Sequence, residues 1–415
     1  MIAATLKRRM PFLLNSGYAA ITNASALLLL ALLTIAGRVL SAADYGRFNY
    51  AIALTLIVET IMDVGLGPVT VRAVARDRAN ASQLLRRVLG LKLVWVGIGL
   101  ALLLIITPIL RPDPALIKLC YLMGLSSAVR SYLLTARGLL QGIDRFDLEA
   151  ALVVADRLVL LAIGGAVLWA GYGLFGLAMA FVASRVLMLL AATLMLSRVV
   201  GSTRPEYDRE AWRTLQAAAL PLGFFMIALN TYNYIDTLIL GIMRSDLETG
   251  WYSAAYRIYE GLTYAPAVLA AVLTPTLSHL FVSDRQAHRR MLMRALAAAL
   301  ALGAVLGGLV AWIAAPILLT LFGVKYAPGV APLQILAGGS LFVFSTWILH
   351  AGAISTNLDS RLLLTTTVGL AANVILNLVL IPHWGIRGAA WATVIAEGLT
   401  VTLLFVQIQR RVREA

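Results

Sequence analysis

Charged side chains inside long apolar segments are the residues of this sequence whose types could do chemistry. A charge near the centre of a bilayer costs about 2.5–3.5 kcal/mol even on insertion scales, so each one needs a partner, a wet cavity or a route to the interface. The basic ones are Lys92, Arg130, Arg157, Arg185 and Arg257, and the acidic ones are Glu59, Asp63, Asp156, Asp236, Glu260 and Glu397.

The arginines predict an anion site. A guanidinium group stays charged and presents a planar fork that binds two phosphate oxygens side by side. Arg130, Arg157 and Arg185 come from three segments of the first half of the chain, and Arg257 comes from the second half. We therefore expect these four side chains to bind a diphosphate. Structural pairing stays an equal alternative for any single arginine, for instance Arg157 with Asp156 or Arg257 with Glu260, three residues on.

The acids could couple transport to an ion. Glu59 and Asp63 lie four residues apart on one helical face, where two like charges repel unless a proton or a cation intervenes. The alternative for Asp63 is pairing with Arg72. Lys92 stands near the end of its apolar segment, so we expect it to extend to the interface rather than to belong to a site. The candidates for H⁺ or Na⁺ coupling are Glu59, Asp63, Asp236, Glu260 and Glu397.

Uncharged polar side chains form two further groups. Tyr256 and Tyr259 stand on an aromatic segment with Tyr252 and Tyr264, and such rings stack on sugars or form an interfacial belt. Two asparagines, at 373 and 377, are four residues apart, and we expect them to hold helices together rather than to bind a ligand.

The sequence contains no motif typical of an enzyme active site. The only cysteine, Cys120, cannot form an internal disulfide, and the four histidines are scattered without metal-ligand spacing. No GxxxxGK phosphate loop occurs either. We therefore expect no catalytic residues, no metal and no cofactor.

Helices in a membrane must position these side chains. Hydrophobic residues make up 60% of the 415 residues and charged residues 13%, against about a quarter charged in soluble domains. Apolar runs reach or approach the roughly 20 residues that span a bilayer, and backbone hydrogen bonding in lipid makes them helices. The predicted spans are 14–37, 48–69, 88–110, 119–136, 150–170, 174–197, 214–242, 250–276, 295–322, 330–354, 362–382 and 388–408.

The net charge of +14 reflects orientation rather than binding to nucleic acid. Lys and Arg are about three times as frequent in the segments on the side of the N-terminus, beginning with Lys7, Arg8 and Arg9, as in those on the other side. This bias is the positive-inside rule, so we expect both termini in the cytoplasm.

An internal repeat divides the chain. The segment from Tyr172 matches the segment from Trp384, with Gly173 opposite Gly385, and a weaker match pairs Gly46 with Gly250. Each helix then corresponds to the sixth one after it, and both halves enter the membrane from the same side. The sequence predicts two parallel six-helix lobes, 1–200 and 214–415, around a central cavity, with a cytoplasmic linker at 201–213.

Three stretches resemble the polysaccharide flippases of the multidrug/oligosaccharidyl-lipid/polysaccharide exporter superfamily, which include O-antigen repeat-unit flippases. They run from Ala43-Asp-Tyr-Gly-Arg-Phe48 to Arg72, from Asp236 to Arg257, and from Asn373 to Trp391 through Leu380-Ile-Pro-His-Trp-Gly-Ile-Arg-Gly388. The resemblance implies two six-helix bundles that alternate between inward-open and outward-open states in the bacterial inner membrane. It implies no enzyme activity.

The resemblance also implies the cargo, an undecaprenyl-diphosphate-linked oligosaccharide that moves from the cytoplasmic to the periplasmic leaflet. Its expected partners are this lipid-linked oligosaccharide, membrane lipids, and the polysaccharide polymerase and chain-length machinery. Two alternatives stay open. One is a multidrug or cation antiporter of the same superfamily, with an acid-lined cavity. The other is a membrane polymerase or ligase, which is expected to need a large periplasmic loop that this sequence lacks.

Overall fold

The computed structural model describes residues 17–18, 21–356 and 358–414, and every regular element within them is a helix. Lys7, Arg8, Arg9 and the start of the predicted first span lie outside these residues. The described chain forms two compact units: unit 1 contains the residues up to Val39 and Leu54–Ile227, and unit 2 contains Leu40–Ala53 and the residues from Ala228 on. Lobe boundaries at 200 and 214 do not coincide with this division, because 40–53 group with the later helices and 201–227 with the earlier ones.

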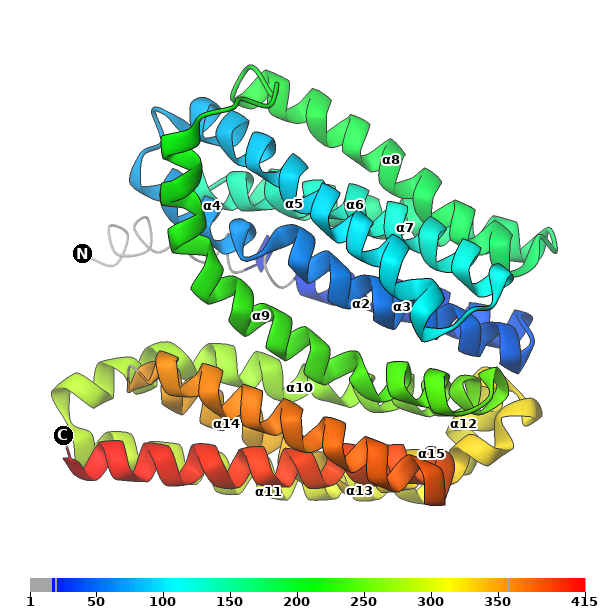
Figure 1. Ribbon diagram of the computed structural model, residues 1–415. Coiled ribbons are helices and arrows are strands. Elements are labelled where there is room, and N and C mark those ends of the chain that lie inside the picture. Colours follow the sequence, from blue (N-terminus) through cyan, green and yellow to red (C-terminus); the bar gives the residue numbers. More distant parts are fainter. Residues whose placement is uncertain (1–16, 19–20, 357, 415) are drawn as a thin grey trace. The chain divides into compact units, whose positions relative to one another are not determined.

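Unit 1 is built around α6, which packs against α4, α5, α7 and α8, while α2 packs against α7. Figure 1 shows α5, α6, α7 and α8 side by side. Leucines of α5, α6 and α8 form one buried cluster there, including Leu85, Leu139 and Leu196. The helices of this unit are α2 (Ala26–Val39), the second half of α3 (Ala42–Asp63), α4 (Leu66–Arg76), α5 (Ala81–Leu110), α6 (Pro114–Gly142), α7 (Phe146–Trp169), α8 (Gly173–Val199) and the first half of α9 (Arg209–Met243).

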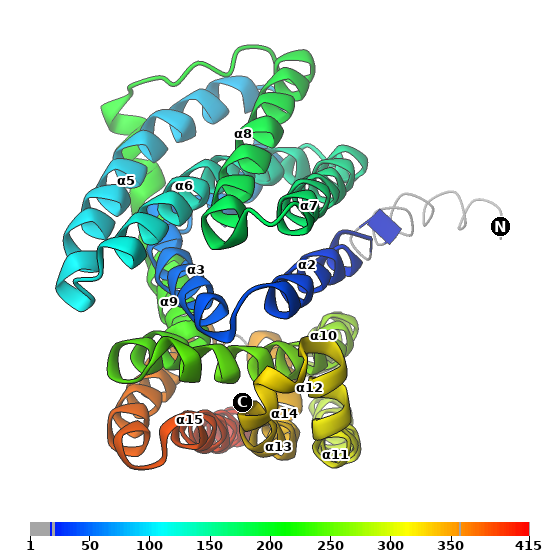
Figure 2. The ribbon, with the colours of Figure 1, turned by 90° about the vertical axis from the view of Figure 1, so that its right-hand side faces the viewer.

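Unit 2 is built around α14, which packs against α10, α11 and α15. α13 lies between α11 and α15, as Figure 2 also shows. The helices of this unit are the remaining halves of α3 and α9, with α10 (Asp246–Ser283), α11 (Arg285–Trp312), α12 (Ala314–Phe322), the 3-10 helix η1 (Val324–Gly329), α13 (Val330–Gly338), α14 (Ser340–Ser355) and α15 (Asp359–Glu414).

About twelve of these segments can cross a membrane, as the sequence predicts. Nine helices of the described part are long and apolar enough, or ten if the pair α13 and α14, bent by 42°, is one span. α15 counts once there, although a kink at Gly385 divides its 56 residues into two segments. α6 falls outside that count, yet its 29 residues are long enough to cross.

Three predicted spans contain breaks that the sequence did not reveal, and the one predicted for 330–354 is the bent pair α13 and α14. The span predicted for 48–69 is α3 followed by α4, because Val64 (φ 43°) and Gly65 (φ 80°) leave helical geometry. A side chain at Gly65 would stand 2.6 Å from the carbonyl oxygen of Ala219, so only glycine lets α9 pass this corner. The span predicted for 295–322 is likewise α11 followed by the short α12.

The segment between α8 and α9 is bound to α5. The Glu206 amide donates to the Arg86 carbonyl at 2.9 Å, and the Trp212 indole donates to the Arg87 carbonyl at 3.0 Å. Ion pairs join the same segments, with Arg87 2.7 Å from Asp208. The segment expected to link two lobes therefore belongs to unit 1.

The repeat is visible in backbone geometry. Gly173 and Gly385 both have positive φ, 64° and 55°, and each precedes the last long helical segment of its half. At the second corner the Arg244 guanidinium donates to the carbonyls of Ile381 and Pro382, both at 2.8 Å. These carbonyls lie just before the kink of α15 at Gly385.

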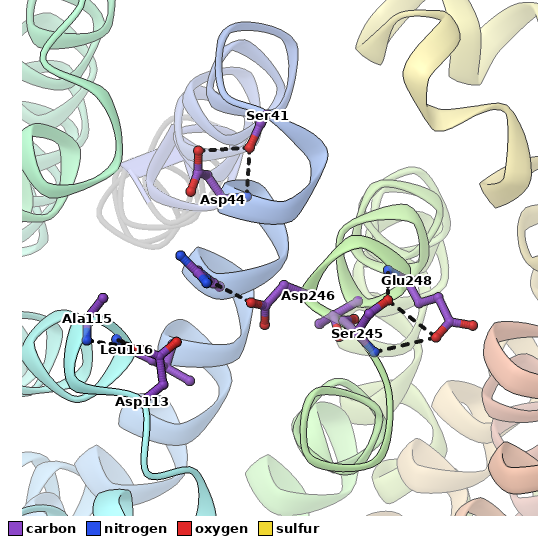
Figure 3. A network of polar contacts seen from close by, with 10 residues as sticks. Ser41, Asp44, Asp113, Ala115, Leu116, Ser245, Asp246 and Glu248 are labelled. Carbon is purple, nitrogen blue, oxygen red and sulfur yellow. Dashed lines mark hydrogen bonds and ion pairs between the residues drawn. The ribbon is translucent and has the colours of Figure 1, made fainter.

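The repeat-related glycines Gly46 and Gly250 touch each other in unit 2, where α3 and α10 begin. A Cβ on Gly46 would lie 1.8 Å from the carbonyl oxygen of Asp246, and one on Gly250 would lie 1.9 Å from that of Ala42. The two contacts are equivalent under the repeat: each glycine contacts the carbonyl oxygen of the residue that lies four positions before the other glycine. An ion pair of Arg47 and Asp246 at 2.7 Å lies beside them (Figure 3).

Side chains fix the two helix starts at this contact. The hydroxyl of Ser41 accepts the amide of Asp44, and that of Ser245 accepts the amide of Glu248 in a capping box (Figure 3). N-caps of this kind are worth about 1 kcal/mol each. They hold the first turns in place, so that glycine meets backbone at a defined position.

Substituting either glycine should weaken unit 2. Gly46→Ala and Gly250→Ala each place a methyl group against backbone, which cannot rotate away, and overpacking of this kind costs about 1–3 kcal/mol. Thermal unfolding of the purified proteins in detergent should show a lower Tm than wild type. Gly308→Ala on α11 is the matched control, because nothing lies within 4 Å of a Cβ there. Equal melting of all three variants would contradict the contact.

Candidate functional site

The structure brings three of the four predicted arginines together in unit 1. Arg130, Arg157 and Arg185 stand near the middle of α6, α7 and α8, helices of 29, 24 and 27 residues. Arg157 lies within electrostatic range of both others, and Arg185 lies within range of Arg130. At 1.5 Å per residue their positions are far from both helix ends. A cluster of positive charge therefore occupies the interior of this unit.

Two of these arginines have acidic partners. The Arg130 guanidinium donates to both carboxylate oxygens of Glu59, at 2.8 and 3.0 Å. Arg185, which is 3% exposed, pairs with Asp156 from the neighbouring helix. Asp156 therefore does not pair with Arg157, the partner suggested by sequence. Adjacent residues of a helix point about 100° apart, and Asp156 points to α8.

Arg157 is different. In the part of the chain that the structure describes, its side chain makes no ion pair or hydrogen bond, and its Nε is buried without a partner. The charges closest to it are mostly positive, those of Arg130, Arg185 and Arg137, with Asp156 as the acidic exception. Its guanidinium is therefore available to bind an anion that is not part of the protein.

Lys92 is fully buried, so the prediction that it extends to the interface is wrong. Its ammonium group lies 2.5 Å from Asp63 Oδ1 and 2.6 Å from Thr135 Oγ1. Asp63 also accepts the Gly67 amide at 3.2 Å, at the break between α3 and α4. The position of Lys92 near the end of its apolar segment suggested that its side chain reaches the membrane interface. Instead, the ion pair with Asp63 of α3 stabilises the charge in the interior.

Glu59 and Asp63 pair with two different basic side chains. Each has its own basic partner, Arg130 for Glu59 and Lys92 for Asp63. Arg72, the partner considered for Asp63, is exposed on α4. The repulsion expected from their spacing is therefore relieved by two cations of the protein.

Arg257 of unit 2 has the partner that its sequence neighbourhood predicts. Its Nη1 lies 2.7 Å from Glu260 Oε2, and its Nη2 donates to Asn49 Oδ1 at 2.8 Å. Asn49 comes from α3, and sequence reasoning missed it. The sequence feature that could have identified Asn49 is its position directly after the Ala43–Phe48 motif.

Asp236 and Glu397, also in unit 2, have only neutral partners among the contacts found. Asp236 is 2% exposed and accepts hydrogen bonds from the Tyr252 hydroxyl at 2.8 Å and the Thr393 hydroxyl at 2.7 Å. Glu397 accepts from the Thr346 hydroxyl at 3.0 Å. Both carboxyls are thus held without a basic side chain hydrogen-bonded to them.

Asn373 and Asn377 hydrogen-bond to each other within α15, through Asn377 Nδ2, at 2.9 Å to the backbone and 2.6 Å to the side chain. The expectation that they join helices is not met, although both are fully buried. Within the described residues no group of His, Cys, Asp and Glu could hold a metal ion.

A cavity of about 150 Å³ opens inside unit 2, and two of the predicted acids, Glu260 and Glu397, lie on its wall. Of the tyrosines on α10, Tyr256 and Tyr259 line it. The others do not: Tyr252 is buried against Asp236, and Tyr264 is 39% exposed. The aromatic segment thus divides into residues that face a cavity and residues that do not.

Comparisons with known proteins agree with this architecture. The probable flippase AglR of Haloferax volcanii is 27% identical over 174 residues, which cover 41% of this chain and 36% of that protein. The matched part is thus about a third of the relative's length.

Two solved structures share the fold. An inward-facing multidrug resistance MATE family transporter of the MOP superfamily aligns with a TM-score of 0.77 and 16% identity over 94% of this chain and 95% of that one. The lipid II flippase MurJ, in an inward closed conformation, aligns with a TM-score of 0.72 and 14% identity over 96% and 87%. The chain therefore shares the fold of these two membrane proteins.

The family itself follows from sequence. The family model described as polysaccharide biosynthesis protein matches residues 15–281, which is more than half of the chain and includes Arg130, Arg157, Arg185 and Arg257. The chain belongs to this polysaccharide biosynthesis protein family.

Proposed function

We propose that the chain is a flippase that moves an undecaprenyl-diphosphate-linked oligosaccharide, an O-antigen or exopolysaccharide repeat unit, across a bacterial inner membrane. The cargo passes from the cytoplasmic to the periplasmic leaflet by alternating access between two lobes, with both chain termini in the cytoplasm. Family membership and the flippase names of AglR and MurJ support the class of function.

The observation that carries the proposal is the guanidinium of Arg157 near the middle of α7, which has no partner among the described residues. A buried charge without a counter-ion is costly, and the cost persists in evolution where function requires it. The diphosphate of the cargo supplies the missing negative charge. Arg130 and Arg185 add positive potential, while their pairing with Glu59 and Asp156 fixes the planes of their guanidinium groups.

The diphosphate has several ligands in this proposal. Arg157 binds it directly, and Arg130, which is 28% exposed at its side chain, lies beside it. Arg257, the fourth predicted ligand, belongs to unit 2. The proposal needs no covalent chemistry, since a flippase moves its cargo without breaking a bond.

Coupling to an ion gradient falls to Asp236 and Glu397 in this proposal. Glu59, Asp63 and Glu260 each have a basic partner within 2.8 Å, which a bound cation would have to displace. Asp236 and Glu397 accept hydrogen bonds from hydroxyl groups only, and a proton or a Na⁺ ion can join such a carboxyl without displacing an arginine. These two therefore carry the H⁺ or Na⁺ coupling.

Arg157→Gln should abolish transport without loss of stability. The change removes a buried charge that no acid compensates, so the Tm should stay equal or rise, while surface polysaccharide in a complemented deletion strain should disappear. Arg185→Gln is the matched comparison, because it leaves Asp156 buried without its partner and should lower stability by about 3–5 kcal/mol.

Three measurements decide the outcome: polysaccharide on the cell surface, protein in the membrane fraction, and equilibrium binding of undecaprenyl diphosphate to purified protein. We expect Arg157→Gln to weaken binding at least tenfold, with Arg145→Gln on an exposed turn as the neutral control. Full complementation by Arg157→Gln would overturn the anion site.

Glu397→Gln and Asp236→Asn should uncouple transport from the ion gradient. Both variants keep hydrogen-bond acceptors but lose the charge that a cation must neutralise. In reconstituted vesicles, wild-type translocation should respond to an imposed proton or Na⁺ gradient, and the variants should not, while binding of undecaprenyl diphosphate without a sugar stays within twofold. Glu59→Gln is the contrast, since freeing Arg130 should lower stability. A gradient response retained by both variants would assign the coupling elsewhere.

A further inference from the structure

We infer that the cavity inside unit 2 is a subsite for a single pyranose ring of the cargo. The inference rests on the proposed function and deepens it, because it assigns the sugar to residues of unit 2 while Arg157 of unit 1 binds the diphosphate. The cavity lies wholly within unit 2, and α9, α10, α14 and α15 all contribute to its wall.

The position of the cavity suits a translocation path. Tyr256, Tyr259 and Glu260 lie roughly 15–21 Å along α10 from its start at Asp246, at a rise of 1.5 Å per residue. The hydrocarbon core of a bilayer is about 30 Å thick, and these residues lie at least ten residues from both ends of the 38-residue helix, inside the part that can span it. A polar cavity at that depth is costly unless it holds water or a polar ligand.

Aromatic rings dominate one part of the wall. Tyr232 comes from α9, Tyr256 and Tyr259 from α10, and Trp347 from α14. The centroids of the Tyr256 and Tyr259 rings are 5.7 Å apart with planes inclined by 59°, so they form a bent surface rather than a stack. Such rings offer a broad apolar face and a polar tip. The C–H face of a pyranose packs on this kind of surface.

Hydrogen-bonding groups complete the wall. Glu260 and Glu397 supply carboxylates, Thr263 and Thr393 supply hydroxyls, and Asn233 supplies an amide. Sugar hydroxyls donate strong hydrogen bonds to carboxylates, and these bonds fix the orientation of a ring that stacking alone would leave free. Among the described residues that line the cavity there is no arginine or lysine, so it does not suit a phosphate.

The size of the cavity limits its occupant. Pockets that enclose drug-sized ligands measure roughly 300–1,000 Å³, and this one measures about 150 Å³. It therefore takes one ring and not a chain of sugars. The rest of the oligosaccharide has to lie outside it.

Charge balance favours a sugar over an organic cation. Glu260 already pairs with Arg257 at 2.7 Å, so its charge is compensated within the protein. A smaller cavity beside Arg257 shares Tyr234 and Tyr256 with the first, which places this guanidinium next to the sugar subsite. The ion pair of Arg257 and Glu260 leaves this side of the pocket without net charge, which suits an uncharged sugar ring.

The test compares two lipids on the purified full-length protein: undecaprenyl diphosphate, and the same lipid carrying one N-acetylhexosamine. Wild type should bind the glycosylated lipid about five- to tenfold more tightly. Trp347→Ala and Tyr256→Ala should lose this preference while their affinity for the bare lipid stays within twofold of wild type. Trp347→Phe, which keeps an aromatic face, should restore most of it.

Tyr264→Ala on the same helix α10 is the matched control, because Tyr264 does not line the cavity, and it should bind both lipids as wild type does. Tm values of all variants show whether they are folded. If wild type binds the two lipids equally and Arg157→Gln weakens both, the sugar subsite is wrong and the proposed function stands.

Two other outcomes also overturn the subsite. If wild type binds neither lipid, the proposed function fails together with it. If Trp347→Ala and Tyr256→Ala weaken binding of tetraphenylphosphonium, used as the probe cation, and leave the sugar preference intact, the cavity binds cations instead.

Discussion

The cost of placing charge inside a membrane is the constraint on which this structure depends. Lys92 and Asp63, Arg130 and Glu59, and Arg185 and Asp156 each join two different helices of unit 1. Each pair leaves a buried charge alone if one partner is removed, so each pair also fixes which helices are neighbours. Against this background of pairing, Arg157 has no ion-pair partner among the described residues, and the proposed function rests on this difference.

Unit 2 meets the same constraint in another way. Its buried carboxyls at Asp236 and Glu397 are bonded to hydroxyls, and its single interior arginine, in the part that the structure describes, has Glu260 and Asn49 as partners. Glycines rather than charges set the closest helix contact, between α3 and α10. The two units thus differ in their interior polar groups. Unit 1 contains Arg157, which has no acidic partner among the described residues, and unit 2 contains a cavity lined by aromatic rings, hydroxyls and carboxyls.

Hydropathy was sufficient to predict the helical membrane fold and about twelve spans, because a segment's length and apolarity decide its transfer into lipid. The pair of Arg257 and Glu260 was also predictable, since both residues lie on one helix. The pair of Lys92 with Asp63 and the pair of Arg185 with Asp156 were not predictable, because each partner lies on another helix and the packing of the helices selects it. The break at Val64 and Gly65 was hidden for a similar reason: apolar residues continue through it, and only the approach of α9 explains the positive φ values.

Thermal stabilisation by ligand tests the central claim, that Arg157 keeps its charge unpaired for a phosphate of the cargo, most directly. A ligand that binds the folded state raises the Tm, and by more when it neutralises a buried charge. Undecaprenyl diphosphate should therefore raise the Tm of the wild-type protein, undecaprenol should not, and Arg157→Gln should lose the shift. An equal shift with diphosphate in wild type and in Arg157→Gln would contradict the account.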